Sequence, residues 1–209
     1  MRRKNLVFLI GILFFLMICV IPIGSMMKIS ENPDEIQKYQ GDKNTLSISW
    51  DRSNIIIDES GYNGMTWLEA ASYEWCSGKG QIYDPYVIEN GKISGRISIS
   101  YSSAYFIIRN CTVSGGIKLS YTNNGILLNN TGCGISLMYH NNYNKIIGNT
   151  LVDNAIGIYL LYDCTYNEIR DNIADYNSMG IFLSFDCNYN NITNNSVCYN
   201  TPGIMIMED

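Results

Sequence analysis

Three side chains in this sequence have the residue types of an acid–base or cation-binding site, and they recur at one spacing. His140, Asp163 and Asp186 each stand six residues after a glycine, and those glycines are 23 residues apart. If the 23-residue units stack like parallel strands, at about 4.8 Å, the side chains lie about 5 and 10 Å apart. Such carboxylates could act as acid and base in glycan cleavage, or bind Ca²⁺ together with His140. The alternative is a structural role, because aspartate is favoured in turns.

Two aromatic residues offer a binding surface instead. Tyr159 and Phe182 stand two residues after their glycines, so in a strand they point opposite to the Ile and Leu beside them. Flat rings along a parallel sheet suit stacking on sugars, and tyrosine hydroxyls supply hydrogen bonds. This spacing predicts a polysaccharide or glycoprotein surface as partner. Burial of the same face against another subunit is the alternative.

A pair of cysteines is the third candidate. Cys164 and Cys187 stand seven residues after their glycines, on adjacent units, where a disulfide, a thiolate pair or a buried ladder of small residues would fit. No cysteine spacing matches a zinc site. Copper takes thiolate, thioether or imidazole ligands, and the sequence offers one histidine and a Met-Ile-Met stretch at 205–207. We therefore expect no resident cofactor, apart from a possible Ca²⁺ at the acidic column.

An internal repeat must position these side chains. Its columns include Gly134, Gly157, Gly180 and Gly203, then Ile135, Ile158, Ile181 and Ile204, then Leu137, Leu160, Leu183 and Ile206. A fixed period of 20 to 50 residues indicates stacked copies of one small unit. Within each unit apolar residues alternate over short runs broken by Gly, Asn and Asp, which is typical of strands and turns. Period 2 excludes helical solenoids, and runs of about four residues are too short for a propeller blade.

The remaining solution is an all-β, right-handed parallel β-helix of about 23 residues per coil, in which equivalent residues lie over one another. Asparagine tolerates the left-handed conformation of sharp turns, and its amide can bond to the amide of the next coil. The asparagine columns are therefore predicted to be structural ladders. These are Asn144, Asn167 and Asn190, and Asn149, Asn172 and Asn195.

The N-terminus carries a targeting signal. Three basic residues at positions 2 to 4 precede an apolar run over residues 6–24, which is typical of a signal peptide or a membrane anchor helix. The predicted organisation is export or anchor segment 1–27, polar linker 28–54, cap and first coils 55–94 with a short helix over 67–75, and repeats 95–209. We therefore expect a secreted or membrane-anchored protein outside the cell, with its N-terminus cytoplasmic if retained.

The net charge of the protein and the last strand of its sequence predict which partners it binds. Without the three basic residues of segment 1–27, the formal net charge changes from −5 to −8, and an acidic surface disfavours nucleic acid as a partner. The sequence stops one strand into a new coil, so self-association through this open coil is predicted, unless the chain is a fragment of a longer protein.

The repeats Gly-Ile-x-Leu…Asn-x-Ile-x-x-Asn, preceded by "SGKGQIYDPYVIENGKISG", resemble the right-handed β-helix repeat proteins of archaeal surfaces. They are similar to the carbohydrate-binding and sugar-hydrolase repeat domain and to NosD-like proteins, over about residues 64 to 209. The resemblance implies the fold, whereas its members include lyases, hydrolases, epimerases, adhesins and copper-accessory proteins. We expect an exported surface protein that binds glycans or serves as a structural part of the envelope. The alternatives are a polysaccharide lyase or hydrolase and a NosD-like copper-accessory protein.

Overall fold

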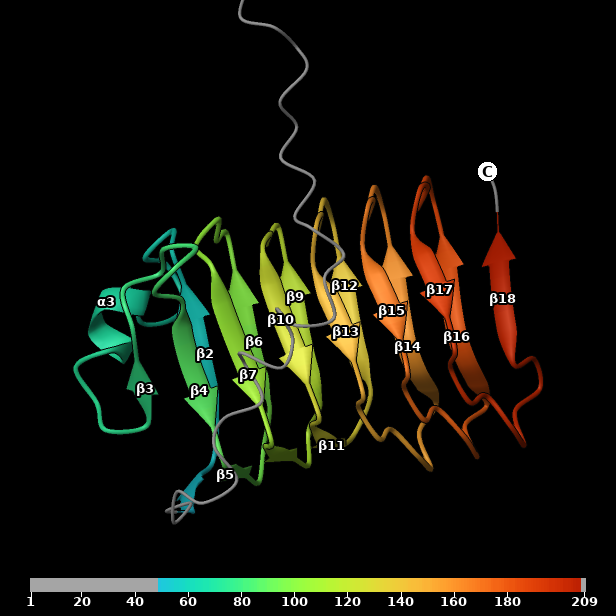
Figure 1. The fold of residues 1–209 in the computed structure, drawn as a ribbon, viewed down its shortest axis with the longest axis horizontal. Coiled ribbons are helices and arrows are strands. Elements are labelled where there is room, and N and C mark those ends of the chain that lie inside the picture. Colours follow the sequence, from blue (N-terminus) through green and yellow to red (C-terminus); the bar gives the residue numbers. More distant parts are fainter. Residues whose placement is uncertain (1–48, 208–209) are drawn as a thin grey trace, which may run out of the picture. The chain divides into compact units, whose positions relative to one another are not determined.

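The computed structural model of the protein describes residues 49–207 as a parallel β-solenoid (Figure 1). Its strands form three sheets that run along the stack. Sheet I contains β1 (Trp50–Arg52), β5 (Gly91–Ile93), β8 (Thr112–Val113) and β11 (Thr131–Gly132). The export segment and most of the predicted linker lie outside the described residues, and within 49–207 no helix is long and apolar enough to cross a membrane.

The other two sheets are longer. Sheet II contains β2 (Ile55–Asp58), β6 (Ile97–Ser100), β9 (Ile117–Ser120), β12 (Ile135–Met138), β14 (Ile156–Leu161), β16 (Met179–Ser184) and β18 (Ile204–Met207). Sheet III contains β3 (Cys76–Ser77), β4 (Tyr86–Glu89), β7 (Phe106–Arg109), β10 (Gly125–Leu128), β13 (Lys145–Ile147), β15 (Glu168–Arg170) and β17 (Asn191–Thr193). Each pairing along these sheets is parallel except that of β3 with β4, so the predicted β-helix fold is confirmed.

The register follows the sequence repeat. Ile158 pairs with Ile135 on one side and with Ile181 on the other, and all three are at most 1% exposed. Full burial of each such side chain contributes about 1.5–3 kcal/mol. Glycine recurs at position 157 for a different reason. A Cβ at this position would lie 2.7 Å from the carbonyl oxygen of Gly180 and 2.8 Å from the Cβ of Ala174. Within β14, the next coil and Ala174 therefore approach Gly157 too closely for a side chain.

Asparagine side chains stabilise the turns by forming hydrogen bonds from one coil to the next. The backbone N–H of Asn149 donates to Oδ1 of Asn172 at 2.9 Å, and its side-chain Nδ2 donates to the carbonyl oxygen of Leu127 at 2.9 Å. The column through Asn144, Asn167 and Asn190 is bonded in the same way. The first two asparagines of each column are at most 1% exposed. Each of their amides therefore bonds to backbone groups that the turns leave without a strand partner.

An aromatic cap covers the first coils. Helix α3 (Trp67–Ala70) begins with a capping box between Thr66 and Glu69. The Trp67 ring stacks on Tyr86 with ring centroids 4.9 Å apart. The prediction of a helix over 67–75 was wrong in length, because 3₁₀-type bonds end it and Tyr73 then stacks against Trp75, 5.8 Å away. Strand β1 lies inside the segment predicted to be a linker and pairs with β5.

Candidate functional site

The structure places His140, Asp163 and Asp186 in one column, on the turns that lead from sheet II to sheet III. All three residues have positive φ angles of 50° to 58°. Backbone bonds stack the turns, since His140 N–H donates to the Tyr162 carbonyl oxygen at 2.9 Å and Asp163 N–H to that of Phe185 at 3.0 Å. Nδ1 of His140 lies 3.6 Å from Oδ2 of Asp163, and both side chains are more than half exposed. Catalysis or Ca²⁺ binding at this column remains a prediction.

Two columns of stacked aromatic rings flank these acidic turns. We call them corner column 1, whose last three members directly precede His140, Asp163 and Asp186, and corner column 2, whose members follow those three residues. Corner column 1 contains Tyr101, Tyr121, Tyr139, Tyr162 and Phe185, with successive ring centroids 5.0, 5.7, 5.2 and 4.6 Å apart. Corner column 2 contains Tyr143, Tyr166 and Tyr189, 5.4 and 5.1 Å apart. Because each ring covers the face of its neighbour, the columns present ring edges and hydroxyls to solvent.

The predicted sugar-stacking pair lies on sheet II. Tyr159 and Phe182 pair in register, and their rings are 5.2 Å apart and parallel within 2°. Tyr159 pairs on its other side with the small Ser136, so that face of its ring is the one left for a sugar. Burial raises the pKa of the Tyr159 hydroxyl, which therefore stays a neutral donor at physiological pH. Sugar stacking remains a prediction.

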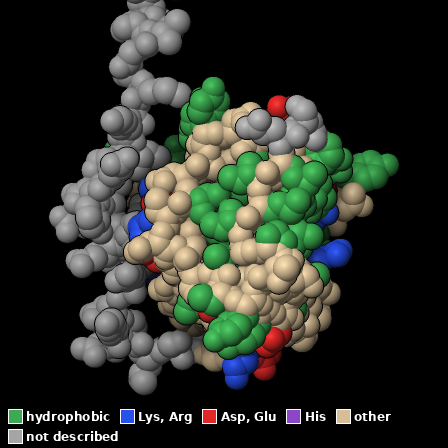
Figure 2. Space-filling view, turned by 90° about the vertical axis from the view of Figure 1, so that its right-hand side faces the viewer, with side chains coloured by type: hydrophobic (Ala, Val, Ile, Leu, Met, Phe, Trp, Pro, Cys, Tyr) green, Lys and Arg blue, Asp and Glu red, His purple; other side chains and the backbone are tan. Residues whose placement is uncertain are grey.

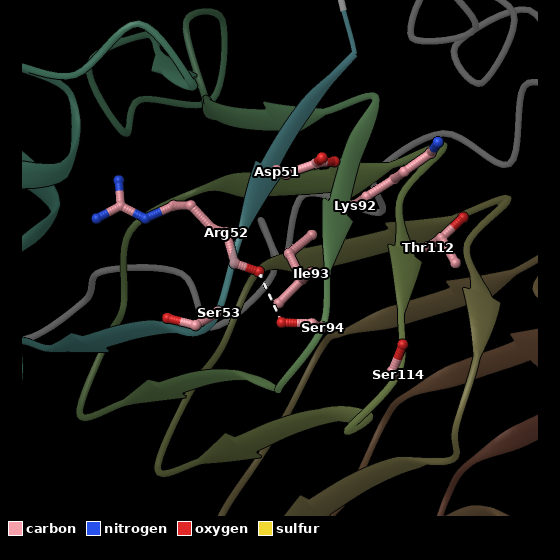
Figure 3. Close-up of a pocket in the computed structure, with 8 residues that line it drawn as sticks. All are labelled: Asp51, Arg52, Ser53, Lys92, Ile93, Ser94, Thr112 and Ser114. Atoms are coloured by element: carbon pink, nitrogen blue, oxygen red, sulfur yellow. Dashed lines mark hydrogen bonds between the residues drawn. The ribbon is translucent and has the colours of Figure 1, made fainter.

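A groove of about 570 Å³ lies over sheet I (Figure 3). The residues that line it are Asp51, Arg52, Ser53, Lys92, Ile93, Ser94, Thr112 and Ser114. The Arg52 guanidinium lies over the Trp75 ring, 4.8 Å from its centroid, and in Figure 3 it points away from Lys92. Sequence reasoning missed this groove, because three of its residues fall in the predicted linker and the others lie outside the regular 23-residue repeats.

Cys164 and Cys187 lie at equivalent places in neighbouring coils, directly after β14 and β16. The hydrogen bond from Cys187 lowers the pKa of the Cys164 thiol, helped by Asn141, whose Nδ2 donates to Cys164 Sγ at 3.6 Å. That bond, together with burial, raises the pKa of Cys187. The pKa values of the two thiols are therefore displaced in opposite directions. Both cysteines are free thiols in the structure, and a disulfide between them stays a prediction.

The end of the solenoid at β18 is apolar. Figure 2 shows hydrophobic side chains gathered on this end. Ile204, Ile206 and Met207 are 46%, 61% and 43% exposed, and β18 pairs with β16 on one side. An apolar strand edge can add a further strand. Self-association there stays a prediction.

Stacked coils with columns of outward side chains define the class of parallel β-solenoid proteins. A family model described as "Periplasmic copper-binding protein (NosD)" matches residues 24–209. The chain therefore belongs to the NosD family, as the repeats had indicated. No curated protein and no solved structure was found to match it.

The family description raises the question of which residues could hold copper. Residues 49–207 contain no cluster of three or more His, Cys, Asp or Glu side chains suited to a metal ion. Cu(II) prefers several imidazoles, and the sequence has one histidine. Cu(I) accepts fewer, softer ligands, and Cys164 and Cys187 are two thiols at equivalent places in neighbouring coils. These donors fit Cu(I) and do not fit Cu(II).

Proposed function

We propose that this chain is an exported β-helix protein that binds a polysaccharide along corner columns 1 and 2. The observation that carries the proposal is the set of exposed tyrosine hydroxyls, repeated once per coil. Among the described residues, these hydroxyls make no hydrogen bond within the protein, so their donors and acceptors are available to a ligand. A regular polymer suits this surface, because each coil offers the same groups.

The ladder itself does not require the hydroxyls. Phe185 occupies the last place in corner column 1, and its ring packs 4.6 Å from that of Tyr162. A phenyl ring therefore packs at this place, tilted by 32° to the ring of Tyr162, whereas Tyr139 and Tyr162 keep a polar group at a site about 40% exposed or less. The carboxylates of Asp163 and Asp186 lie between the two columns and would accept hydrogen bonds from sugar hydroxyls. The ligand would contact ring edges and hydroxyls and would not insert between rings.

Removing the hydroxyls while keeping the rings tests the proposal. The full chain is screened on a glycan array and by affinity electrophoresis in polysaccharide gels, with and without Ca²⁺. The variant Tyr139→Phe, Tyr162→Phe, Tyr166→Phe should lose binding at least tenfold and keep its circular dichroism spectrum. A matched control, Tyr62→Phe in an exposed loop of the cap, should bind like the wild type. Unchanged binding by the triple variant, or no binding by the wild type, would refute the proposal.

The same screen tests the enzymatic alternative. Release of oligosaccharide that the Asp163→Ala, Asp186→Ala variant abolishes would make the protein a polysaccharide lyase or hydrolase. The basic residues closest in the repeats, Lys145 and Arg170, lie on sheet III strands and pair with Glu168 at 3.5 and 2.5 Å. Their charges are thus engaged away from the acidic column, which favours binding over cleavage.

A second candidate function is that of a copper-accessory protein. Two observations favour it: the family match over residues 24–209 and the soft thiol pair at Cys164 and Cys187. It is compatible with polysaccharide binding, because the thiols belong to the inward side of the coil and the tyrosines to its outer side. Measurement of Cu(I) bound per chain tests it, and a chain that binds none would refute it.

A further inference from the structure

We infer that Asn129 is the acceptor of one N-linked glycan, attached after the chain has been exported. This inference rests on the export that the proposed function includes, and it is independent of polysaccharide binding. Four stretches of the sequence have the acceptor pattern Asn-x-Ser or Asn-x-Thr, and they begin at Asn110, Asn129, Asn191 and Asn194. This pattern is modified where it lies in a surface loop of a secreted protein. The structure therefore decides which of the four stretches is accessible.

Asn129 lies in an exposed turn that leads from β10 to β11. Its φ angle is 53°, and its backbone N–H donates to the carbonyl oxygen of Ile147 at 3.0 Å. The next residue, Asn130, is buried, and its backbone N–H donates to Oδ1 of Asn149 at 2.9 Å. Thr131 is again exposed. The asparagine ladder therefore holds the middle residue of the acceptor pattern inward and leaves Asn129 and Thr131 on the surface.

The amide and the hydroxyl that the modification requires are not used by the fold. Within residues 49–207, the side chains of Asn129 and Thr131 make no hydrogen bond. The amide also has a small neighbour, because a Cβ built on Gly148 of the next coil would lie 2.4 Å from Oδ1 of Asn129. The Asn129 amide thus extends over a place in the next coil that carries no side chain, which favours attachment of a bulky group.

Two of the other acceptor stretches are less suited. In the stretch that begins at Asn194, both polar groups are engaged. Nδ2 of Asn194 donates to Oδ1 of Asp171 at 2.9 Å, and Oγ of Ser196 donates to the carboxylate of Asp175 at 2.8 and 3.1 Å. Asn191 begins the strand β17 and is not in a turn. We therefore expect both asparagines to stay unmodified.

Asn110 occupies the equivalent turn one coil before Asn129. Its φ angle is 52°, and it is exposed. Thr112 and Thr131 pair in register on β8 and β11. Because neighbouring coils are about 4.8 Å apart, glycans on both asparagines would compete for the same space. Asn110 lies between Asn90 and Asn129, with no glycine beside it, so the single glycan is assigned to Asn129.

The attachment is a group transfer in which nothing is oxidised or reduced. Nδ2 of Asn129 forms a bond to the anomeric carbon of an oligosaccharide that is carried on a lipid pyrophosphate. The bond from this carbon to the pyrophosphate oxygen breaks, and the lipid pyrophosphate leaves with the electron pair. Nδ2 loses one proton to a base of the glycosyltransferase.

A glycan at this turn leaves the proposed polysaccharide surface open. In Figure 1, β5 and β11 of sheet I lie along the lower edge of the stack, whereas the chain turns from sheet II to sheet III along the upper edge. Corner columns 1 and 2 belong to those upper turns. The modified residue and the tyrosine hydroxyls are therefore on opposite edges of the solenoid.

Peptide mass spectrometry of the full chain, recovered from the envelope of the cell that produces it, tests the site. We expect a glycan mass on the peptide that contains Asn129, in the wild type and in the matched control Asn110→Gln. The glycan should be lost in Asn129→Gln and in Thr131→Val, and it should be kept in Thr131→Ser, which retains the hydroxyl. Circular dichroism checks the fold of each variant.

The outcomes separate this site from the proposed function. An exported wild-type chain without a glycan at Asn129, or a glycan that persists in Thr131→Val, would refute the site alone. A glycan on Asn110 in the wild type would show that the assignment to Asn129 is wrong. Polysaccharide binding by Asn129→Gln should equal that of the wild type. A chain found only in the cytoplasm on cell fractionation would refute the export that both proposals require.

Discussion

Removing one amide from the second asparagine column should cost about as much stability as deleting a large core side chain. The side chain of Asn172 is 1% exposed and makes four hydrogen bonds. Its Oδ1 accepts from the backbone N and from Nδ2 of Asn149 at 2.9 and 3.0 Å, and its Nδ2 donates to Ile146 O and Asn195 Oδ1 at 2.8 and 2.9 Å. At about 1 kcal/mol for each bond, Asn172→Ala should lower the free energy of unfolding by about 4 kcal/mol.

Urea unfolding followed by far-ultraviolet circular dichroism measures this loss, with Asn188→Ala as the control. Asn188 is an exposed turn residue of the next coil, and its replacement should change the free energy by no more than about 0.5 kcal/mol. A solenoid can unfold in segments, so the comparison requires equal m-values for the two variants. If Asn172→Ala is as mild as the control, the ladder bonds merely replace bonds to water, and the reasoning is refuted.

Three further predictions follow from single sites. Bonds from Ser60 lower the pKa of buried Asp58, so its contribution to stability is present above about pH 4 and lost as the pH falls below it; Asp58→Asn should flatten the acid limb of a stability-versus-pH curve. Gly78→Ala would drive a Cβ into the Pro85 carbonyl at a positive φ, so the melting temperature should fall by several degrees, whereas unchanged melting would contradict the clash. Leu160→Ala removes a fully buried side chain and should cost about 2–5 kcal/mol in urea unfolding; a loss below about 1 kcal/mol would show that the wall collapses around the gap.

The sequence was enough to predict the stacking, because inward positions obey a rule that every coil shares. Ile135 and Ile158 recur 23 residues apart and pair in register. The first coils were harder, because they lack the period: the cap depends on contacts between distant residues, such as the bond of 2.9 Å from Trp67 Nε1 to Ser102 Oγ.

The candidate sites were only partly accessible to the same reasoning. Spacing placed Tyr159 and Phe182 side by side, but it could not show that their rings lie face to face and cover one another. Spacing likewise aligned Cys164 with Cys187, whereas the state of their protons depends on local hydrogen bonds. The groove over sheet I depends on β1, a three-residue strand that the sequence repeat does not predict. Orientation and charge are properties of contacts, and a period carries no information about them.

The outward-facing columns contain the positions that packing between the coils constrains least. Inside the coil, a change at one position disturbs the coils above and below, so Ile and Asn persist. Outside, sheet III carries Lys145, Glu168 and Asn191 at equivalent places, where the residue type varies although Lys145 and Glu168 form an ion pair at 3.5 Å. Corner column 2 instead keeps tyrosine in three consecutive coils at exposed left-handed positions, although glycine or asparagine would be less strained there. The hydroxyls of these tyrosines are not used by the fold, and they are the groups through which we propose that a polysaccharide binds.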